Sequence, residues 1–412
     1  MTDVLRRGRA SLAFGFFAQG VAFALLVTRI PAVQARYGVS DALLPLFLAA
    51  VPVLAGAGSV TTEHLVKRVP PSRLLRWSQP VVLLGLLGVG AGGVGQLAAL
   101  AVALGVFGLA VGVLDASMNM LGVSLQRSYG RSIMLSFHAA YSLGGIIGAS
   151  LAWAGAHWHL ALWVSYLPVV AVLLPAVLVG SRWYVDAGEA GATVAVPGGG
   201  GAAGGGGTLV FRLLLPLCLV MTFAYIGDST VSNWSAKYLK DVLGSSEQLA
   251  TVPYNVYMVT TLLGRTIGDF GVRRFGAVAV VRLGAVVAAG GFAVVASASG
   301  AWAGMLGFTL LGLGLCVLVP QTFAAAGRLF PGASDAAVAR LNIFNYVGFL
   351  VGSPLVGALG DAWSYRGAML VPMVLVLVTL GYARSFAAQP DRYGGGHERP
   401  RTADVGRGSN GL

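Results

Sequence analysis

The sequence predicts an all-α integral membrane protein, in which twelve transmembrane helices form two six-helix bundles related by a pseudo-two-fold repeat. Three observations predict it: a composition too apolar for a soluble fold, a succession of long apolar runs, and a glycine-rich segment between two similar halves. Of the 412 residues, 56% are hydrophobic and 10% are charged, and the mean hydropathy is +0.79. Soluble domains carry about 25% charged residues. The chain therefore holds more apolar surface than a soluble fold can bury.

The apolar runs are long enough to cross a bilayer as helices. At a rise of about 1.5 Å per residue, roughly 20 residues span the ~30 Å hydrocarbon core. The runs are apolar on all faces, which favours helices over the alternating pattern of barrel strands. In the first half they lie near residues 11–29, 41–61, 77–94, 97–120, 133–155 and 160–180. In the second half they lie near residues 211–234, 248–267, 277–298, 301–326, 336–359 and 367–388.

The remaining segments divide the chain into domains. Residues 1–10 are expected to form a cytoplasmic tail before the first bundle at 11–180. The segment 181–208 contains two runs of four glycines, cannot bury a core, and is expected to be a flexible cytoplasmic linker. The second bundle occupies 209–388. Residues 389–412, with Pro, Gly and several Arg, are expected to be a disordered cytoplasmic tail.

Lys and Arg residues predict the orientation. With the N-terminus inside, 22 of the 27 Lys and Arg residues fall in tails or loops on the inner side. Such residues are retained in the cytoplasm, so both termini are expected there. The Arg residues flank apolar runs and form no basic domain, so the net charge of +12 does not indicate nucleic-acid binding. A composition rich in Ala, Gly and Arg but poor in Lys suggests the inner membrane of a GC-rich bacterium.

The two halves repeat each other at nearly constant offsets. Four residues after the second span align with four residues 206 positions later: Gly58, Glu63, Lys67 and Arg68 with Gly264, Asp269, Arg273 and Arg274. At an offset of 204, the fifth span aligns with the eleventh: Phe137, His138, Tyr141, Gly144 and Gly148 with Leu341, Asn342, Asn345, Gly348 and Gly352. Parallel halves of this kind are one of the arrangements on which alternating-access transport is built.

These motifs resemble those of the major facilitator superfamily. Gly264 to Asp269 and the following Arg273-Arg274-Phe275-Gly276 are similar to its signature loop, and the copy after the second span is degenerate because Val69-Pro70-Pro71 replaces the usual Gly and basic run. Asp115 to Asn119 resembles the acidic-x-x-x-Asn element of the fucose permease branch. Segments 29–31 and 137–141 look like bacterial members near that branch. The resemblance implies a transporter that needs no cofactor.

The signature loop is expected to gate the inner side. Gly264 and Gly268 are four residues apart, so a second helix can approach closely. Asp269 can accept hydrogen bonds from Arg273 or Arg274, or face the positive N-terminus of a neighbouring helix. The resemblance implies that such contacts stabilise the outward-open state; ordinary loop capping is the alternative. The gate candidates are Arg29, Glu63, Gly264, Gly268, Asp269, Arg273 and Arg274.

Two carboxylic acids lie deep inside predicted spans. Asp115 lies 12 residues before Arg127, about 18 Å from the inner edge, and Asp228 lies about 13 Å from the outer edge. A carboxylate at that depth is costly to keep ionised and can exchange a proton when water enters. Both are therefore candidates for proton coupling. The alternative for Asp115 is a neutral helix-fastening role. The alternatives for Asp228 are an extracellular gate or a salt bridge with Arg29, unless Arg29 simply snorkels to the outer headgroups.

The resemblance also implies where a solute binds. Helices 1, 4, 7 and 10 line the central cavity of the superfamily, which makes candidates of Gln19, Asn119, Tyr225 and Gln321. Asn119 shares a helical face with Asp115, and Tyr225 shares one with Asp228. Such a site is partly polar and partly aromatic, which suits a small organic solute better than a bare ion. A role in joining helices is the alternative to solute binding for Gln19 and Gln321. Packing between helices is likewise the alternative to a functional role for His138, Asn342 and Asn345.

The sequence thus predicts a monomeric secondary transporter in the lipid bilayer, moving a small organic solute by proton-linked alternating access. The alternative is a proton antiporter that exports a drug or natural product, and the direction stays open. An enzyme is not expected, since no HExxH or GxSxG motif appears. No metal site is expected, because Cys218 and Cys316 both lie inside apolar runs. A receptor that binds without transport would not explain the repeated halves.

Overall fold

The computed structural model describes residues 3–40, 43–93, 95–186, 207–250, 252–330 and 334–387. These residues form helices and turns, with no strand among them. Ten helices in this part of the chain are long and apolar enough to cross a membrane. The predicted all-α membrane fold class is therefore confirmed. Most of the predicted linker and the C-terminal tail lie outside the described residues.

The first half contains α1 (Asp3–Thr28), α2 (Ile30–Tyr37), α3 (Leu44–Leu65), α4 (Pro71–Ala91), α5 (Leu97–Tyr129), α6 (Met134–His157), α7 (Leu162–Gly180) and the short 3-10 helix η1 (Ser181–Trp183). Residues 3–10, expected to be a tail, continue the first helix. Asp3 lies in its first turn, where a negative charge is favourable. Gly8, in the next turn, lets the helix approach Val185 closely.

The second half contains α9 (Gly207–Lys237), η2 (Tyr238–Val242), α10 (Glu247–Ala250), α11 (Val252–Phe275), α12 (Ala277–Ser297), α13 (Ala301–Leu315), α14 (Leu318–Leu329), α15 (Ser334–Ala362), α16 (Tyr365–Ala368), α17 (Leu370–Tyr382) and η3 (Ala383–Phe386). The span expected at 301–326 is interrupted between α13 and α14. Pro320 lacks the N–H that would bond to the carbonyl of Cys316. This backbone carbonyl therefore lacks its helical hydrogen-bond partner.

The two halves use the same packing scheme. In the first half α1 packs on α6, α3 and α4 pack on α5, and α4 packs on α7. Their counterparts in the second half are α9 on α15, α11 and α12 on α13, and α12 on α17. Gly144 and Gly148 of α6 lie against the backbone of α1. The glycines aligned with them, Gly348 and Gly352 of α15, lie against the backbone of α9, so the sequence repeat corresponds to a repeat of close helix contacts.

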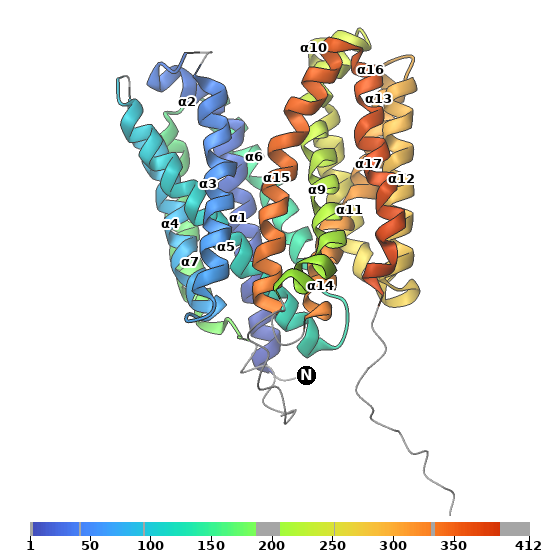
Figure 1. Ribbon diagram of the computed structural model, residues 1–412. Coiled ribbons are helices and arrows are strands. Elements are labelled where there is room, and N and C mark those ends of the chain that lie inside the picture. The colour runs from blue at the N-terminus through green and yellow to red at the C-terminus, as the bar shows by residue number, and fades with distance from the viewer. Residues whose placement is uncertain are drawn as a thin grey trace, which may run out of the picture.

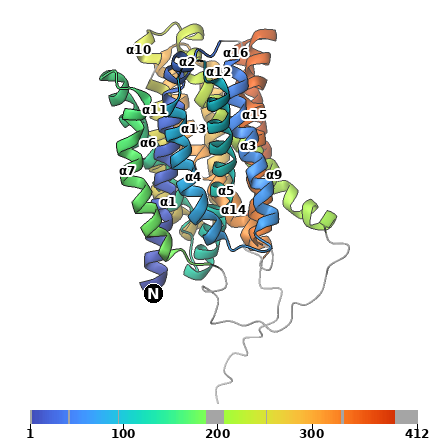
Figure 2. The same cartoon turned by 90° about the vertical axis from the view of Figure 1, so that its left-hand side faces the viewer.

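The halves lie side by side and are joined at one end (Figure 1). We call the end at which α1 begins the basal end, and the opposite end, which carries α2 and α10, the apical end. The described chain also ends at the basal end, and Figure 2 shows the long helices of the first half running between the two ends. The ribbons of the halves diverge toward the apical end in Figure 1. Hydrogen bonds link α11 and α15 to α3, α5 and α6 toward the base.

Two further long helices, α3 and α11, run alongside the ten candidate spans. They pack on α5 and α13, respectively. α11 is the more polar, because it carries Arg265, Asp269, Arg273 and Arg274. Three of these charged side chains bond to the first half. The polarity of α11 therefore reflects its place at the interface between the halves.

Candidate functional site

Asp115 lies near the middle of α5 and receives hydrogen bonds from both halves. From the first half, Nε2 of Gln19 on α1 donates to Oδ1 over 2.9 Å. From the second half, the hydroxyl of Tyr346 and Nδ2 of Asn345, both on α15, donate to Oδ2 over 3.0 and 3.3 Å. The structure thus brings Gln19 and Asp115 together and adds two donors from the other half. All three donors are neutral, so hydrogen bonds rather than a salt bridge hold this carboxyl group.

A chain of amides continues from Asp115 toward the base. Nδ2 of Asn345 also lies 2.9 Å from Oδ1 of Asn342. Nδ2 of Asn342 in turn donates to Oγ of Ser59 on α3 over 2.9 Å. Asn342 and Ser59 are fully buried, where polar groups need partners. Both asparagines therefore join α15 to the first half in this conformation.

Asp228 lies on α9, in the second half. Its Oδ1 accepts a hydrogen bond of 2.5 Å from the hydroxyl of Tyr257 on α11. The side chain is partly buried. The hydrogen bond that it accepts comes from a residue of its own half. In contrast to Asp115, Asp228 does not tie the halves together directly through this bond.

Arg265 of α11 is a third charged group of the interface. Its Nε donates over 3.4 Å to the carbonyl of Cys316, the acceptor that Pro320 leaves without its helical partner. Its Nη1 reaches the first half, where it donates to Oγ of Ser142 over 2.7 Å and more weakly to the carbonyl of His138 over 3.4 Å. Ser142 is eight residues into α6, about 12 Å from the helix start. Arg265 was missed as a site residue from the sequence.

Two tyrosines lie among these charged groups. Tyr141 on α6 and Tyr225 on α9 have hydroxyl groups that lie within electrostatic range of Asp115, Asp228 and Arg265. Within the described part of the chain, neither hydroxyl makes a hydrogen bond. Tyr225 is a predicted solute-binding residue, whereas Tyr141 is not. Together the tyrosines add two free polar groups and two aromatic rings to the interface.

Asn119 and Gln321, also predicted to bind solute, have other surroundings. Nδ2 of Asn119 donates to the backbone carbonyl of Asp115 over 2.9 Å, and its Oδ1 lies 3.3 Å from Nε2 of His138. The His138 ring packs near two phenylalanine rings, one from each half. Gln321 is fully buried in α14, and neither amide atom has a hydrogen-bond partner among the described residues. In this conformation Asn119 and His138 belong to the packing around the site.

At the base, Asp269 of α11 caps a helix of the other half. Its carboxylate accepts hydrogen bonds from Oγ of Ser132 over 2.6 Å, from the backbone N–H of Ser136 over 2.9 Å and from that of Leu135 over 3.3 Å. These groups lie at the start of α6, where free N–H groups favour a negative charge. Arg273 bonds instead to the carbonyl of Ser132 over 3.1 Å. Asp269 was expected either to bond to Arg273 or Arg274 or to face a helix N-terminus. In the structure it faces the N-terminus of α6.

A second basal contact lies between α3 and α15. Glu63 forms an ion pair with Arg340 across the interface. Beside the first contact, Gly268 fits closely against the side chain of Leu135 on α6. Both copies of the repeated loop motif therefore contribute an acidic residue to the basal contacts between the halves, although the first copy is degenerate in sequence.

Three predicted gate residues make their described contacts within their own halves. Arg29 is buried near the apical end, where its guanidinium donates to the carbonyls of Ala152 over 3.2 Å and Leu160 over 3.1 Å. It secures the end of α6 and does not pair with the acid of α9. Gly264 packs against α13. The guanidinium of Arg274 lies over the ring of the adjacent phenylalanine.

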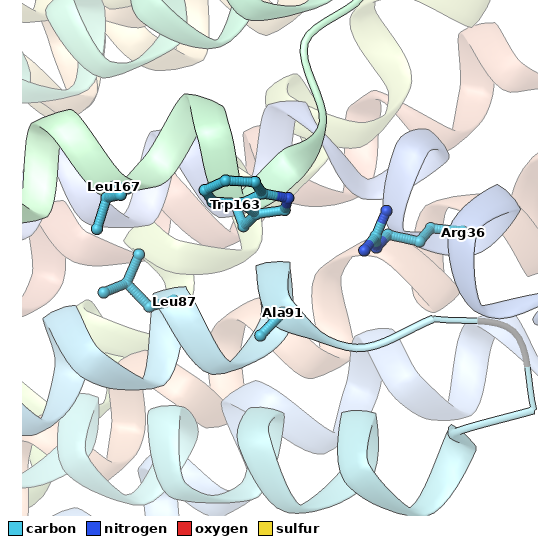
Figure 3. A pocket seen from close by; sticks show the side chains of 5 residues that line it. All are labelled: Arg36, Leu87, Ala91, Trp163 and Leu167. Carbon is cyan, nitrogen blue, oxygen red and sulfur yellow. The ribbon is translucent and has the colours of Figure 1, made fainter.

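A separate hollow of about 370 Å³ lies within the first half (Figure 3). Leu87 and Ala91 of α4 and Trp163 and Leu167 of α7 line it, with Arg36 of α2 at one side. Trp163 is 48% exposed, so the hollow opens on the surface of this half. It is distinct from the polar groups between the halves.

Comparisons with known proteins agree with this architecture. A family model described as Major Facilitator Superfamily matches residues 217–402. An uncharacterized MFS-type transporter of Yersinia pestis is 29% identical over 395 residues, covering 92% of this chain and 95% of the relative. The transporter FucP in its outward conformation superposes with a TM-score of 0.75 at 18% identity, over 92% of this chain and 98% of FucP.

A third comparison extends the likeness of fold. The proton:xylose symporter XylE superposes with a TM-score of 0.69 at 13% identity, over 92% of this chain and 94% of XylE. At these low sequence identities, the two solved structures indicate a similar fold and nothing more. The full-length relative and the family model add likeness in sequence. With its repeated loop motifs and paired helix contacts, the chain is thus similar in sequence and in fold to transporters of the major facilitator superfamily, FucP among them.

Proposed function

We propose that this protein is a proton-coupled secondary transporter that carries a small organic solute across the bacterial inner membrane by alternating access. One observation carries the proposal: the Asp115 carboxyl group accepts hydrogen bonds from both halves. A change in its protonation therefore alters contacts within one half and between the halves at once. A group of this kind can couple proton binding to a movement of the halves.

The proposed coupling follows from hydrogen-bond chemistry. An ionised carboxylate accepts several hydrogen bonds, and its negative charge strengthens each of them. Protonation removes the charge and turns one oxygen into a donor, so the bonds from Asn345 and Tyr346 weaken. The state with a closed base is then less favoured. Because a ligand shifts a conformational equilibrium by its differential affinity, a proton that binds the base-open state better drives the halves toward it.

The orientation of the molecule gives this step a direction. The excess of Lys and Arg on the basal side supports a cytoplasmic base. The described conformation, joined at the base, then faces outward, in agreement with its likeness to FucP in the outward conformation. A proton entering from outside would favour opening toward the cytoplasm. Since FucP and XylE are described as proton symporters, we favour symport of proton and solute.

Solute-dependent proton movement in proteoliposomes tests this function. Purified protein is reconstituted with a trapped pH-sensitive dye, and sugars, polyols and organic acids are added singly. At least one compound is expected to acidify the vesicle interior faster when the protein is present, because a transported solute molecule enters together with a proton. Protein-free liposomes are the control. Protein-dependent entry of solutes, measured by mass spectrometry, without any change in dye signal would contradict the proposal.

A further inference from the structure

The arginine at the interface has no acidic partner at bonding distance. In the described part of the chain, ion pairs within 4 Å involve other arginines and a lysine, and Arg265 is in none of them. Its bonded partners are two carbonyls and one hydroxyl, all neutral. A cation held inside a membrane protein without a paired anion is costly and marks a functional site.

Two nitrogens of the Arg265 guanidinium make hydrogen bonds with the described residues, and the third does not. Nε is bonded to the second half and Nη1 to the first. Nη2 makes no hydrogen bond with the described residues, and it is not among their fully buried unpaired atoms. An arginine fork can bind a carboxylate through two parallel N–H groups. Arg265 therefore presents at least one free donor from a fixed position.

The acids near Arg265 are engaged elsewhere. Asp228 is close enough for its charge to interact with Arg265, but it accepts its hydrogen bond from Tyr257. Asp115 is bonded by three neutral donors of α1 and α15. Neither carboxylate occupies the free side of the guanidinium. The free hydroxyls of Tyr141 and Tyr225 lie within electrostatic range of the same arginine. Each can donate a hydrogen bond to a solute hydroxyl group or accept one from it.

Resting on the transport function proposed above, we propose that Arg265 binds the carboxylate of the transported solute, which is a hydroxylated organic acid. The carboxylate would pair with the free donor of Arg265, and hydroxyl groups of the solute would bond to Tyr141 and Tyr225. A neutral solute would leave the half-buried cation unpaired, and a cationic solute would be repelled by it. The proposal thus specifies a solute class different from the neutral sugars named for FucP and XylE.

Paired solutes that differ only at the acid group test the proposal. Proteoliposomes with an inward proton gradient receive an equimolar mixture of four pairs, each an acid with its neutral alcohol. The pairs are D-galacturonate with D-galactose, D-gluconate with sorbitol, lactate with 1,2-propanediol, and 4-hydroxybenzoate with 4-hydroxybenzyl alcohol. Mass spectrometry measures the protein-dependent entry of each compound. At least one carboxylate is expected to enter tenfold faster than its neutral partner. Arg265→Gln is expected to lower this ratio at least tenfold.

Three variants separate solute binding from structure. Arg282→Gln removes an exposed arginine of α12 and should leave the ratio unchanged. Ser142→Ala removes the shorter of the two hydrogen bonds across the interface but keeps the cation. It should therefore preserve the preference for the acid even if the rate changes. If Arg265→Gln does not fold, Arg265→Lys replaces it in the test. Because an ammonium lacks the fork geometry, the ratio should fall severalfold.

The outcomes also distinguish this inference from the general function. If no carboxylate in the mixture enters in a protein-dependent way, or if the ratio survives loss of the Arg265 guanidinium, the inference is overturned. Proton-dependent entry of the neutral partners would overturn it while leaving the proposed transporter intact. Carboxylate entry that depends on Arg265 but ignores the proton gradient would support the site and refute the coupling.

Discussion

Asp115→Asn is expected to abolish solute accumulation driven by a pH gradient, while exchange of solute down its own concentration gradient continues. The amide has nearly the same shape as the acid and can still accept a bond from Gln19 or Tyr346, but it cannot bind and release a proton. It therefore resembles a permanently neutral carboxyl group. In proteoliposomes, the internal solute concentration should then rise no higher than the external one, and counterflow of preloaded solute should persist.

An acid outside the site provides the matched control. Asp361 lies near the apical end of α15, where it accepts a local hydrogen bond from Tyr365 and is exposed. Asp361→Asn makes the same chemical change and should accumulate solute like the unmodified protein. Undiminished accumulation by Asp115→Asn would reject the coupling role of Asp115. Loss of both accumulation and counterflow would instead indicate that the substitution disrupts the fold or the solute site.

Asp269→Asn is expected to open the base of the molecule more often. The charged carboxylate accepts two backbone N–H bonds and one hydroxyl bond from the other half, and bonds to a charged group contribute about 1.5–3 kcal/mol each. Loss of about 1.4 kcal/mol changes an equilibrium tenfold. A cysteine introduced by Val123→Cys, which is buried against Gly327 of the other half, should then react with maleimide about tenfold faster.

A capping aspartate within one half is the control for this experiment. Asp186 accepts hydrogen bonds from the backbone N–H and the hydroxyl of Ser72, at the start of α4 in its own half. Asp186→Asn therefore removes the same kind of helix cap without touching the interface. Its labelling rate at the introduced cysteine should stay unchanged. Equal rates in Asp269→Asn and the unmodified protein would favour simple helix capping over a gate.

The sequence predicts the architecture well because the signals for it are local. Apolar runs and glycine spacing are read along one helix, and the close contacts of Gly144 and Gly348 follow from them. The depth of Asp115 is likewise set by its distance from Arg127 along α5. The family resemblance implies that helices 1 and 4 line one cavity, which places Gln19 near Asp115. The structure brings these two side chains together in a hydrogen bond.

What the sequence does not reveal depends on contacts between segments far apart. In the sequence, Arg265 belongs to a motif of an inner loop. Its position within the predicted span 248–267 nevertheless indicates a functional role, because charged residues inside a membrane are costly. Its position depends on the carbonyl freed by Pro320, some 55 residues later. Tyr346, next to the aligned Asn345, could not be linked to Asp115 without knowing how the halves meet. For Gln321, helix position alone does not specify which face it occupies.

The most direct test of the central claim is the distance between the apical ends at two pH values. Spin labels are attached through Trp158→Cys and Trp363→Cys, which lie exposed in opposite halves, after the buried native cysteines are replaced by alanine. Electron spin resonance should detect a longer distance at high pH, where ionised Asp115 favours the closed base, and a shorter one on acidification. In Asp115→Asn the distance should not respond to pH. An equal pH response in both proteins, or none in either, would contradict the account.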